Sequence, residues 1–96
     1  MITLTPAAAW QIRRAAEVSF GDPVHLRLAA KVVADGEIEF GMGFDDPRTG
    51  DLEVVCEGIT LLVAKPSQEL MKDVMIDFRE VEPGDARFVF ARAEAP

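Results

Sequence analysis

The sequence predicts an α+β fold dominated by antiparallel sheet, with one N-terminal helix and one short later helix. Three observations predict it: a capped helical pattern near the N-terminus, alternating apolar residues over most of the remainder, and turn signals between the runs. A chain of 96 residues is the size of one domain, so residues 1–96 are expected to form a single domain. With 49% hydrophobic and 28% charged residues, the composition is that of a globular chain.

The N-terminal helix is expected to begin at Thr5-Pro6. Threonine caps free backbone N–H groups, and proline suits the first helical position. Gly21-Asp22-Pro23 is expected to end the helix, because glycine terminates helices and proline cannot continue them. Helical spacing predicts one shared face for Ala8, Ile12, Ala15, Ala16 and Ser19.

The rest of the chain reads as strands joined by tight turns. Val24, Leu26 and Leu28 alternate with polar residues, as in a half-buried strand. Asp35-Gly36 predicts a hairpin into the run 38–44, whose large apolar residues alternate with glycine and glutamate. Two more hairpins are expected, joining 52–56 to 59–64 and 74–81 to 87–92. Between them, Ser67 is expected to cap a short helix reaching Lys72.

The net charge of −7 is concentrated in the middle of the chain. Residues 34–57 hold one basic and eight acidic side chains. This balance argues against nucleic-acid and anionic-membrane partners, both of which need clustered lysine and arginine. No run approaches the roughly 20 apolar residues of a membrane span, and no signal peptide is visible. We therefore expect a cytoplasmic protein with a reduced thiol.

The chemistry-bearing residues are few. One cysteine and one histidine exclude an internal disulfide and any zinc finger. The chain has no glycine-rich phosphate loop, nucleophile elbow or cluster of metal ligands. We therefore expect no enzymatic activity.

Several short segments occur in a characteristic order and spacing along nearly the whole chain. They are residues 2–9, 11–13, 26–28, 41–46, 57–59 and 77–78. In this order and spacing the chain resembles the A-type iron–sulfur carrier family, also called HesB-like or IscA-like. This resemblance implies a HesB-like domain of curved β-sheets packed with a few helices, which often forms dimers or tetramers. It also implies binding of iron or an iron–sulfur cluster by three cysteines, and transfer of that cargo to acceptor proteins.

The ligand positions of the family are not matched. An ungapped alignment places the first ligand at Asp35, and no Cys-Gly-Cys occurs before Pro96. Cys56 corresponds to none of the three ligands, so no cofactor is expected. In these respects the chain resembles the cysteine-less, DsrR-like branch that accompanies bacterial sulfur oxidation. Met42–Asp46 and Glu82–Gly84 support that closer resemblance.

Two residues nevertheless keep a metal-binding alternative open. The Asp35 carboxylate could replace one ligand, although Asp-Gly is also the ordinary composition of a tight turn. Cys56 could contribute to a site shared between subunits, although a thiol within an apolar strand is usually a small buried hydrophobe. Glu53 and Glu57 flank Cys56 and disfavour its thiolate.

Candidate interaction residues lie outside the ligand positions. Trp10 is predicted either to lie beneath the C-terminal strand or to mark an interface. Glycine on the outer face of the strand 38–44 predicts close approach by another backbone or by part of the same chain. An acidic loop could attract a basic partner, although a solvated turn is the simpler interpretation. The candidates are Trp10, Arg13, Arg14, Gly41, Gly43, Asp45 and Asp46.

The sequence therefore predicts a non-catalytic descendant of iron–sulfur carriers that lacks the ligand cysteines. Its expected role is that of a protein-interaction or regulatory module linked to sulfur or iron–sulfur metabolism. The partner is an unidentified protein, and a homodimer is left open. The alternative is a carrier of iron or an iron–sulfur cluster that uses non-standard ligands or ligands shared between subunits.

Overall fold

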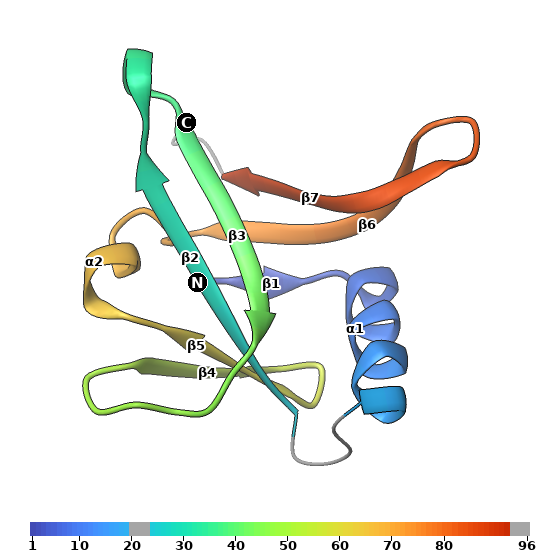
Figure 1. Cartoon of the computed structure of the whole chain (residues 1–96), viewed down its shortest axis with the longest axis horizontal. Helices are drawn as coiled ribbons and strands as arrows, with labels where there is room; N and C mark the ends of the chain where they lie inside the picture. The colour runs from blue at the N-terminus through green and yellow to red at the C-terminus, as the bar shows by residue number, and fades with distance from the viewer. Residues whose placement is uncertain (20–23, 93–96) are drawn as a thin grey trace.

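A computed structural model describes residues 1–19 and 24–92. It confirms the α+β class, with two helices and curved sheets (Figure 1). A 3₁₀ turn at Ala34–Gly36 joins two of the strands. The elements in chain order are β1 (Thr3–Leu4), α1 (Pro6–Ser19), β2 (His25–Val32), β3 (Ile38–Phe44), β4 (Leu52–Cys56), β5 (Ile59–Val63), α2 (Lys65–Gln68), β6 (Val74–Glu82) and β7 (Asp85–Arg92).

The strands form two sheets, ordered β3-β2-β5-β4 and β1-β6-β7. The three hairpin pairings are antiparallel, as expected, whereas β2 pairs with β5 and β1 with β6 in parallel. Strand β1 is too short to show alternation, so its pairing with β6 carries no local signal. In Figure 1 the β2–β3 hairpin projects away from β4 and β5, and the β6–β7 hairpin extends past α1.

The start of α1 matches the prediction, and its buried face differs by one position. The Ala8 N–H donates to Thr5 Oγ1 at 3.2 Å, which is the expected cap. Ala9 is buried instead of Ala15, which is exposed. The buried stripe follows the helix side that faces β6, and alanine gives little hydropathy contrast to reveal that side. The Ser19 side chain and the 21–23 stop signal lie outside the described residues.

The β2–β3 and β4–β5 hairpins occur where turn chemistry places them. Asp35 and Gly36 have φ of 66° and 75°, and the Val33 N–H donates to the Glu37 carbonyl at 2.8 Å. Glu57 and Gly58 have φ of 53° and 77° between β4 and β5. Paired positive φ angles are what the two-residue turn at Glu57-Gly58 requires. Asp35 and Gly36 instead belong to a three-residue turn, 34–36, between the bonded residues Val33 and Glu37.

The predicted role of Ser67 as a helix cap is wrong. The short helix α2 begins at Lys65, so Ser67 lies inside it and is buried. Its hydroxyl donates to the Ala30 carbonyl at 3.2 Å and accepts from the Ala30 N–H at 3.1 Å. The parallel pairing of β2 with β5 ends at Leu28, so Ala30 lies beyond the paired part of β2. Ser67 therefore satisfies a strand residue that the parallel pairing no longer reaches.

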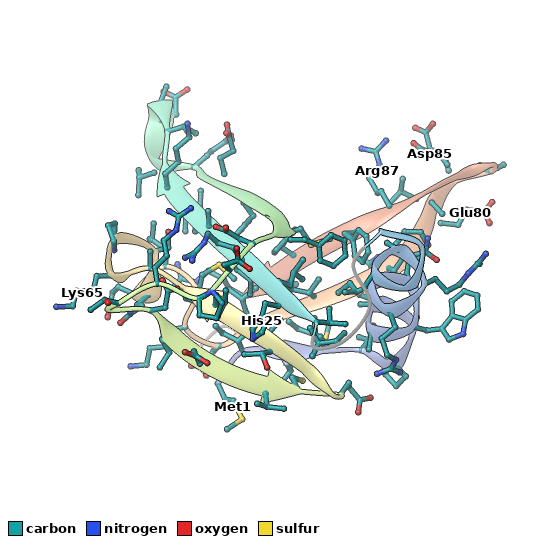
Figure 2. All side chains as sticks on the ribbon, turned by 60° about the horizontal axis from the view of Figure 1, so that its bottom comes forward. Met1, His25, Lys65, Glu80, Asp85 and Arg87 are labelled. Atoms are coloured by element: carbon teal, nitrogen blue, oxygen red, sulfur yellow. The ribbon has the colours of Figure 1, made fainter. Side chains whose placement is uncertain are left out.

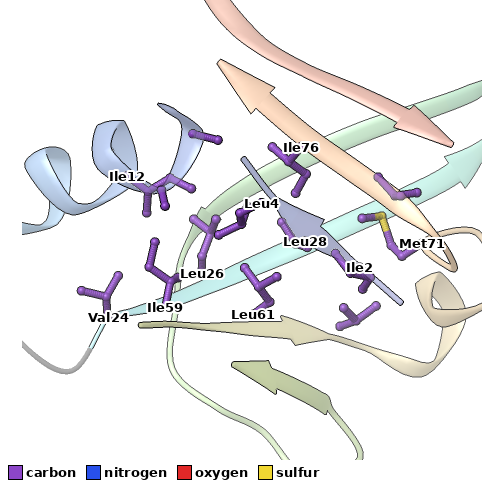
Figure 3. Packing of buried hydrophobic residues seen from close by; sticks show 14 of the residues in the cluster. Ile2, Leu4, Ile12, Val24, Leu26, Leu28, Ile59, Leu61, Met71 and Ile76 are labelled. Atoms are coloured by element: carbon purple, nitrogen blue, oxygen red, sulfur yellow. The ribbon is translucent and has the colours of Figure 1, made fainter. Parts of the chain in front are cut away.

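The core fills the space between the two sheets and α1 (Figure 3). Aromatic side chains of β3, β6 and β7 contact one another at one side of this core. Phe40 of β3 stacks on Phe90 of β7 with ring centroids 5.1 Å apart, and Phe78 meets Phe88 edge-on at 4.8 Å. The fully buried large side chains are Ile12, Leu26, Leu28, Ile59, Leu61, Leu62, Val63, Met71, Val74 and Ile76.

Candidate functional site

The two candidate ligands lie at opposite edges of the four-stranded sheet. Asp35 is exposed in the turn that leads into β3, which forms one edge of the sheet. Cys56 ends β4, which forms the other edge, and is half-buried. The Leu4 N–H donates to Cys56 Sγ at 3.3 Å, so the thiol connects β1 of one sheet to β4 of the other. The fold therefore separates Asp35 from Cys56 within one chain.

The described residues contain no group of three or more His, Cys, Asp or Glu side chains arranged to hold a metal ion. Cys56 is the one cysteine of the sequence, and an iron–sulfur cluster bound by protein thiolates generally has four such ligands. One copy of the described chain therefore does not fit a complete cluster site. Any bound cluster would need ligands from another molecule.

The acidic loop between β3 and β4 is held by an arginine that sequence reasoning passed over. Arg27 of β2 donates to Asp45 Oδ2 at 2.6 Å and to both carboxylate oxygens of Asp51 at 2.8 Å. Arg27 Nη2, which is one of the two nitrogens bonded to Asp51, also donates to the Asp46 carbonyl at 3.1 Å. Arg27 is separated from Asp45 and Asp51 by 18 and 24 positions, so no helical or strand period links them.

This hydrogen bonding sets the charge state of the loop. The Arg27 guanidinium lowers the pKa of Asp51 to about 2, aided by the Arg48 backbone N–H. It also lowers the pKa of Asp45, together with the Asp46 backbone N–H. The two carboxylates in turn raise the pKa of Arg27. Asp45 is therefore engaged within its own chain, whereas Asp46 stays exposed.

Trp10 is exposed on the outer side of α1, with 56% of its surface accessible. A position beneath the C-terminal strand, one of the two alternatives for this residue, is therefore wrong. The Arg14 guanidinium lies 4.7 Å from the ring centroid, a cation–π contact one helical turn away. Arg13 instead donates to the carbonyl of Glu57 in the β4–β5 turn. The two arginines thus have different local roles.

Gly41 and Gly43 form an open strip on the outer face of β3. Both are exposed, and a Cβ atom added to either would meet no described atom within 4 Å. The alternative in which a helix or aromatic residue of the same chain crosses the strip is therefore wrong for the described residues. The approach of another molecule stays a prediction.

An apolar groove lies beside this strip and was not predicted from the sequence. It has a volume of about 170 Å³ and lies between α1, the end of β3 and β7. Ile12, Met42 and Phe88 contribute to its lining from these three elements. The groove depends on how distant elements pack, so no local pattern could reveal it.

Charged side chains also gather at the tip of the β6–β7 hairpin. Figure 2 shows Glu80, Asp85 and Arg87 at this end of the molecule, near α1. The Gly84 N–H donates to Glu80 at 2.9 Å, and Arg87 pairs with Asp85 at 2.5 Å. These contacts stabilise the turn locally.

Comparisons with known proteins agree with the fold. No family model matches the chain. It is 30% identical over 80 residues to an uncharacterized protein SufA of Bacillus subtilis, spanning 82% of this chain and 67% of the relative. It is 27% identical over 95 residues to a putative iron–sulfur cluster insertion protein ErpA 2 of Burkholderia vietnamiensis, spanning 98% and 76%.

Solved structures give the same relationship. Escherichia coli SufA, involved in biosynthesis of iron–sulfur clusters, superposes with a TM-score of 0.80 and 26% identity, covering 99% of this chain and 82% of that one. IscA with a [2Fe–2S] cluster superposes at 0.79 with 24% identity, covering 96% and 85%. The fold is thus that of iron–sulfur carriers. The chain belongs to the A-type iron–sulfur carrier family.

The comparisons bear on two expectations, the absence of a cofactor and the branch of the family. The prediction of no cofactor, drawn from the ligand positions, is contradicted because a chain of the same fold is solved with a [2Fe–2S] cluster. The narrower resemblance to the cysteine-less, DsrR-like branch is not established. The relatives place the chain in the carrier family at large, and the chain contains one cysteine. No helix among the described residues is long and apolar enough to cross a membrane.

Proposed function

We propose that this protein serves iron–sulfur or sulfur metabolism as a non-catalytic protein-interaction or regulatory module. It works in the cytoplasm as one domain comprising residues 1–96, and its partner is a protein. The observation that carries this proposal is the placement of Asp35 and Cys56. The position of the first family ligand is an exposed hairpin turn, and the cysteine is an inter-sheet contact at the opposite edge.

The family relationship supports the choice of pathway. The name of the ErpA 2 relative places it in iron–sulfur cluster insertion, and SufA of Escherichia coli is described as involved in cluster biosynthesis. The substitution of aspartate at the first ligand position favours the DsrR-like branch within that family. Exposed Trp10 and the open β3 strip supply surface for a partner.

Affinity capture from anaerobic native lysate tests this role. The tagged protein is compared with a Leu28→Asp variant, in which a buried strand residue is replaced to disrupt the fold. We expect the folded chain to enrich proteins of iron–sulfur or sulfur metabolism over this control. Equal capture by both forms, or enrichment of proteins from unrelated pathways, would contradict the proposal.

A second candidate function is suggested by the [2Fe–2S] cluster of the IscA neighbour. Two or more copies could together hold iron or a cluster as cargo, with Cys56 or Asp35 supplied by each. Anaerobic incubation with ferrous iron and sulfide, followed by absorption and iron analysis, tests this function. It requires iron binding that is lost in Cys56→Ser or Asp35→Ala. Unchanged binding in both variants would eliminate it.

A further inference from the structure

We infer that the free edge of β3 accepts an extended segment of a partner protein as an added antiparallel strand, and that this segment alternates basic and apolar residues. The inference rests on the proposed interaction role and names the surface and the partner chemistry. It is carried by the hydrogen-bond register of β3, the open glycine strip, the apolar groove and the charge of the strand.

The register fixes which backbone groups of β3 face outward. The Val33 N–H donates to the Glu37 carbonyl, and the Asp45 N–H donates to the His25 carbonyl. In an antiparallel pair, hydrogen-bonded positions alternate with non-bonded ones. The odd-numbered residues of β3 therefore bond to β2, and the even-numbered residues point their N–H and C=O groups away from it.

Among the described strands, β3 lies at the edge of its sheet, and β2 is the one strand beside it. No hydrogen bond within the described residues engages the backbone of Ile38, Phe40 or Met42 on that side. The β3 edge, defined by these three residues, therefore offers donors and acceptors at the spacing of a β-ladder.

Both faces beside this edge are suited to an added strand. On the outer face, Gly41 and Gly43 leave room for the side chains of an incoming segment. On the inner face, Phe40 and Met42 are half-buried, and Met42 lines the apolar groove together with Phe88. A neighbouring strand would therefore meet open space on one side and apolar surface on the other.

The charge of β3 selects a basic segment over a second copy of this chain. Glu37 and Glu39 are exposed, and they lie between exposed Asp35 and Asp46. Among the described residues, Lys31 forms an ion pair with Glu39, with Lys31 Nζ 3.7 Å from Glu39 Oε1. A second copy would bring an equally acidic β3 from a chain of net charge −7. Lysine or arginine of a partner would instead lie beside the two glutamates.

The geometry also determines the pattern within the partner. Directly opposed residues of an antiparallel pair point to the same face of the sheet. Partner residues opposite Phe40 and Met42 therefore point inward and are apolar, and their backbone groups bond to β3. The basic residues lie between them, on the outer face, with backbone groups turned away from β3.

N-methylated peptides test this arrangement, because N-methylation removes a backbone donor and keeps the charge. The probe is a fluorescein-labelled nine-residue peptide of alternating valine and lysine with blocked ends, and binding is measured by anisotropy. We expect methylation at the valines to weaken binding by about tenfold or more, whereas methylation at the lysines leaves it nearly unchanged. Equal effects of the two peptides, or the reverse order, would overturn the inference.

Protein variants test the charge. Glu39→Lys is expected to weaken peptide binding several-fold, whereas Glu69→Lys, an exposed change outside β3, has a smaller effect. Equal effects of the two variants would count against the β3 edge. If lysate partners are captured equally by wild type and Glu39→Lys, the proposed function stands and this surface is wrong. Self-association abolished by Glu39→Lys would identify a second copy as the occupant and reject the basic segment.

Discussion

Arg27 and Asp51 form a bidentate ion pair, in which two guanidinium nitrogens donate to the two carboxylate oxygens, each at 2.8 Å. This pair connects the second strand to a loop 24 residues further along the chain. Leu62, directly beside Arg27 in the sheet register, is fully buried although it lies outside the main core cluster. We infer that Arg27 holds the acidic loop over this face of the sheet.

Replacing Arg27 with alanine is expected to destabilise the protein, because it leaves the Asp51 carboxylate, whose side chain is 3% exposed, without its side-chain donors. The loss is measured as a fall in the urea midpoint. The matched control is Arg48→Ala, which removes an exposed partner of Asp45 and is expected to lower the midpoint less. Equal losses for the two variants would show that Arg27 has no special role in holding the loop.

The same pair predicts a dependence of stability on acid. The pKa of Asp51 is lowered from 3.8 to about 2 in the folded protein. A carboxyl group with a depressed folded-state pKa contributes stability that is present above its unfolded pKa and lost as pH falls through the folded one. We expect the urea midpoint of the wild type to fall between pH 4 and pH 2, values set by that shift.

An Asp51→Asn variant isolates this contribution from the other carboxylates. It is expected to be less stable at neutral pH and to lose less stability over the same acidic range, since residue 51 no longer titrates. Urea midpoints at several pH values compare the two proteins. A pH dependence identical to that of the wild type would mean that Asp51 titrates alike in the folded and unfolded states.

Ser67→Ala is expected to cost about 1–3 kcal/mol, because it leaves the buried N–H and carbonyl of Ala30 without their partner. Amide hydrogen exchange at Ala30 is expected to accelerate more than exchange at Leu26 or Leu28, which lie within the paired part of β2. The exposed residue Thr49 supplies a control through Thr49→Ala. Unchanged exchange at Ala30 would mean that the serine hydroxyl is dispensable.

The stack of Phe40 on Phe90 joins the two sheets and predicts measurable coupling. In a double-mutant cycle with leucine at each position, the interaction free energy is expected to be about 0.5–1.5 kcal/mol. Phe78 and Phe40, which have no described ring contact with each other, form the comparison pair. A coupling no larger than that of the comparison pair would contradict a role for the stack in joining the sheets.

Local chemistry allowed much of the fold to be predicted. The Thr5 cap and the paired positive φ angles at Asp35-Gly36 and Glu57-Gly58 depend on neighbours a few residues away. The alternation in β3 likewise places its large apolar residues toward the core. These features follow from backbone sterics and a period of two, which any short stretch of sequence displays.

The candidate site was less predictable. The residues Trp10, Gly41 and Gly43 could be named in advance, but their exposure could not be fixed. Helical spacing does not tell which side of α1 faces β6, and alternation does not tell whether a strand lies at an edge. Both depend on contacts between segments far apart in the chain, as do the roles of Arg27 and Ser67.

The amino-acid sequence decided the kind of most elements, the family and how few residues could ligate a metal, because each follows from residue identity and local spacing. Strand β1, which carries no local signal, was not among the elements it decided. The tertiary structure decided that Asp35 and Cys56 lie at opposite edges of one sheet and that no second strand of the described residues pairs with β3. Strand order is set by the burial of apolar surface across the whole chain. The distance between two candidate ligands, and the freedom of an edge, therefore exist only once that order has formed.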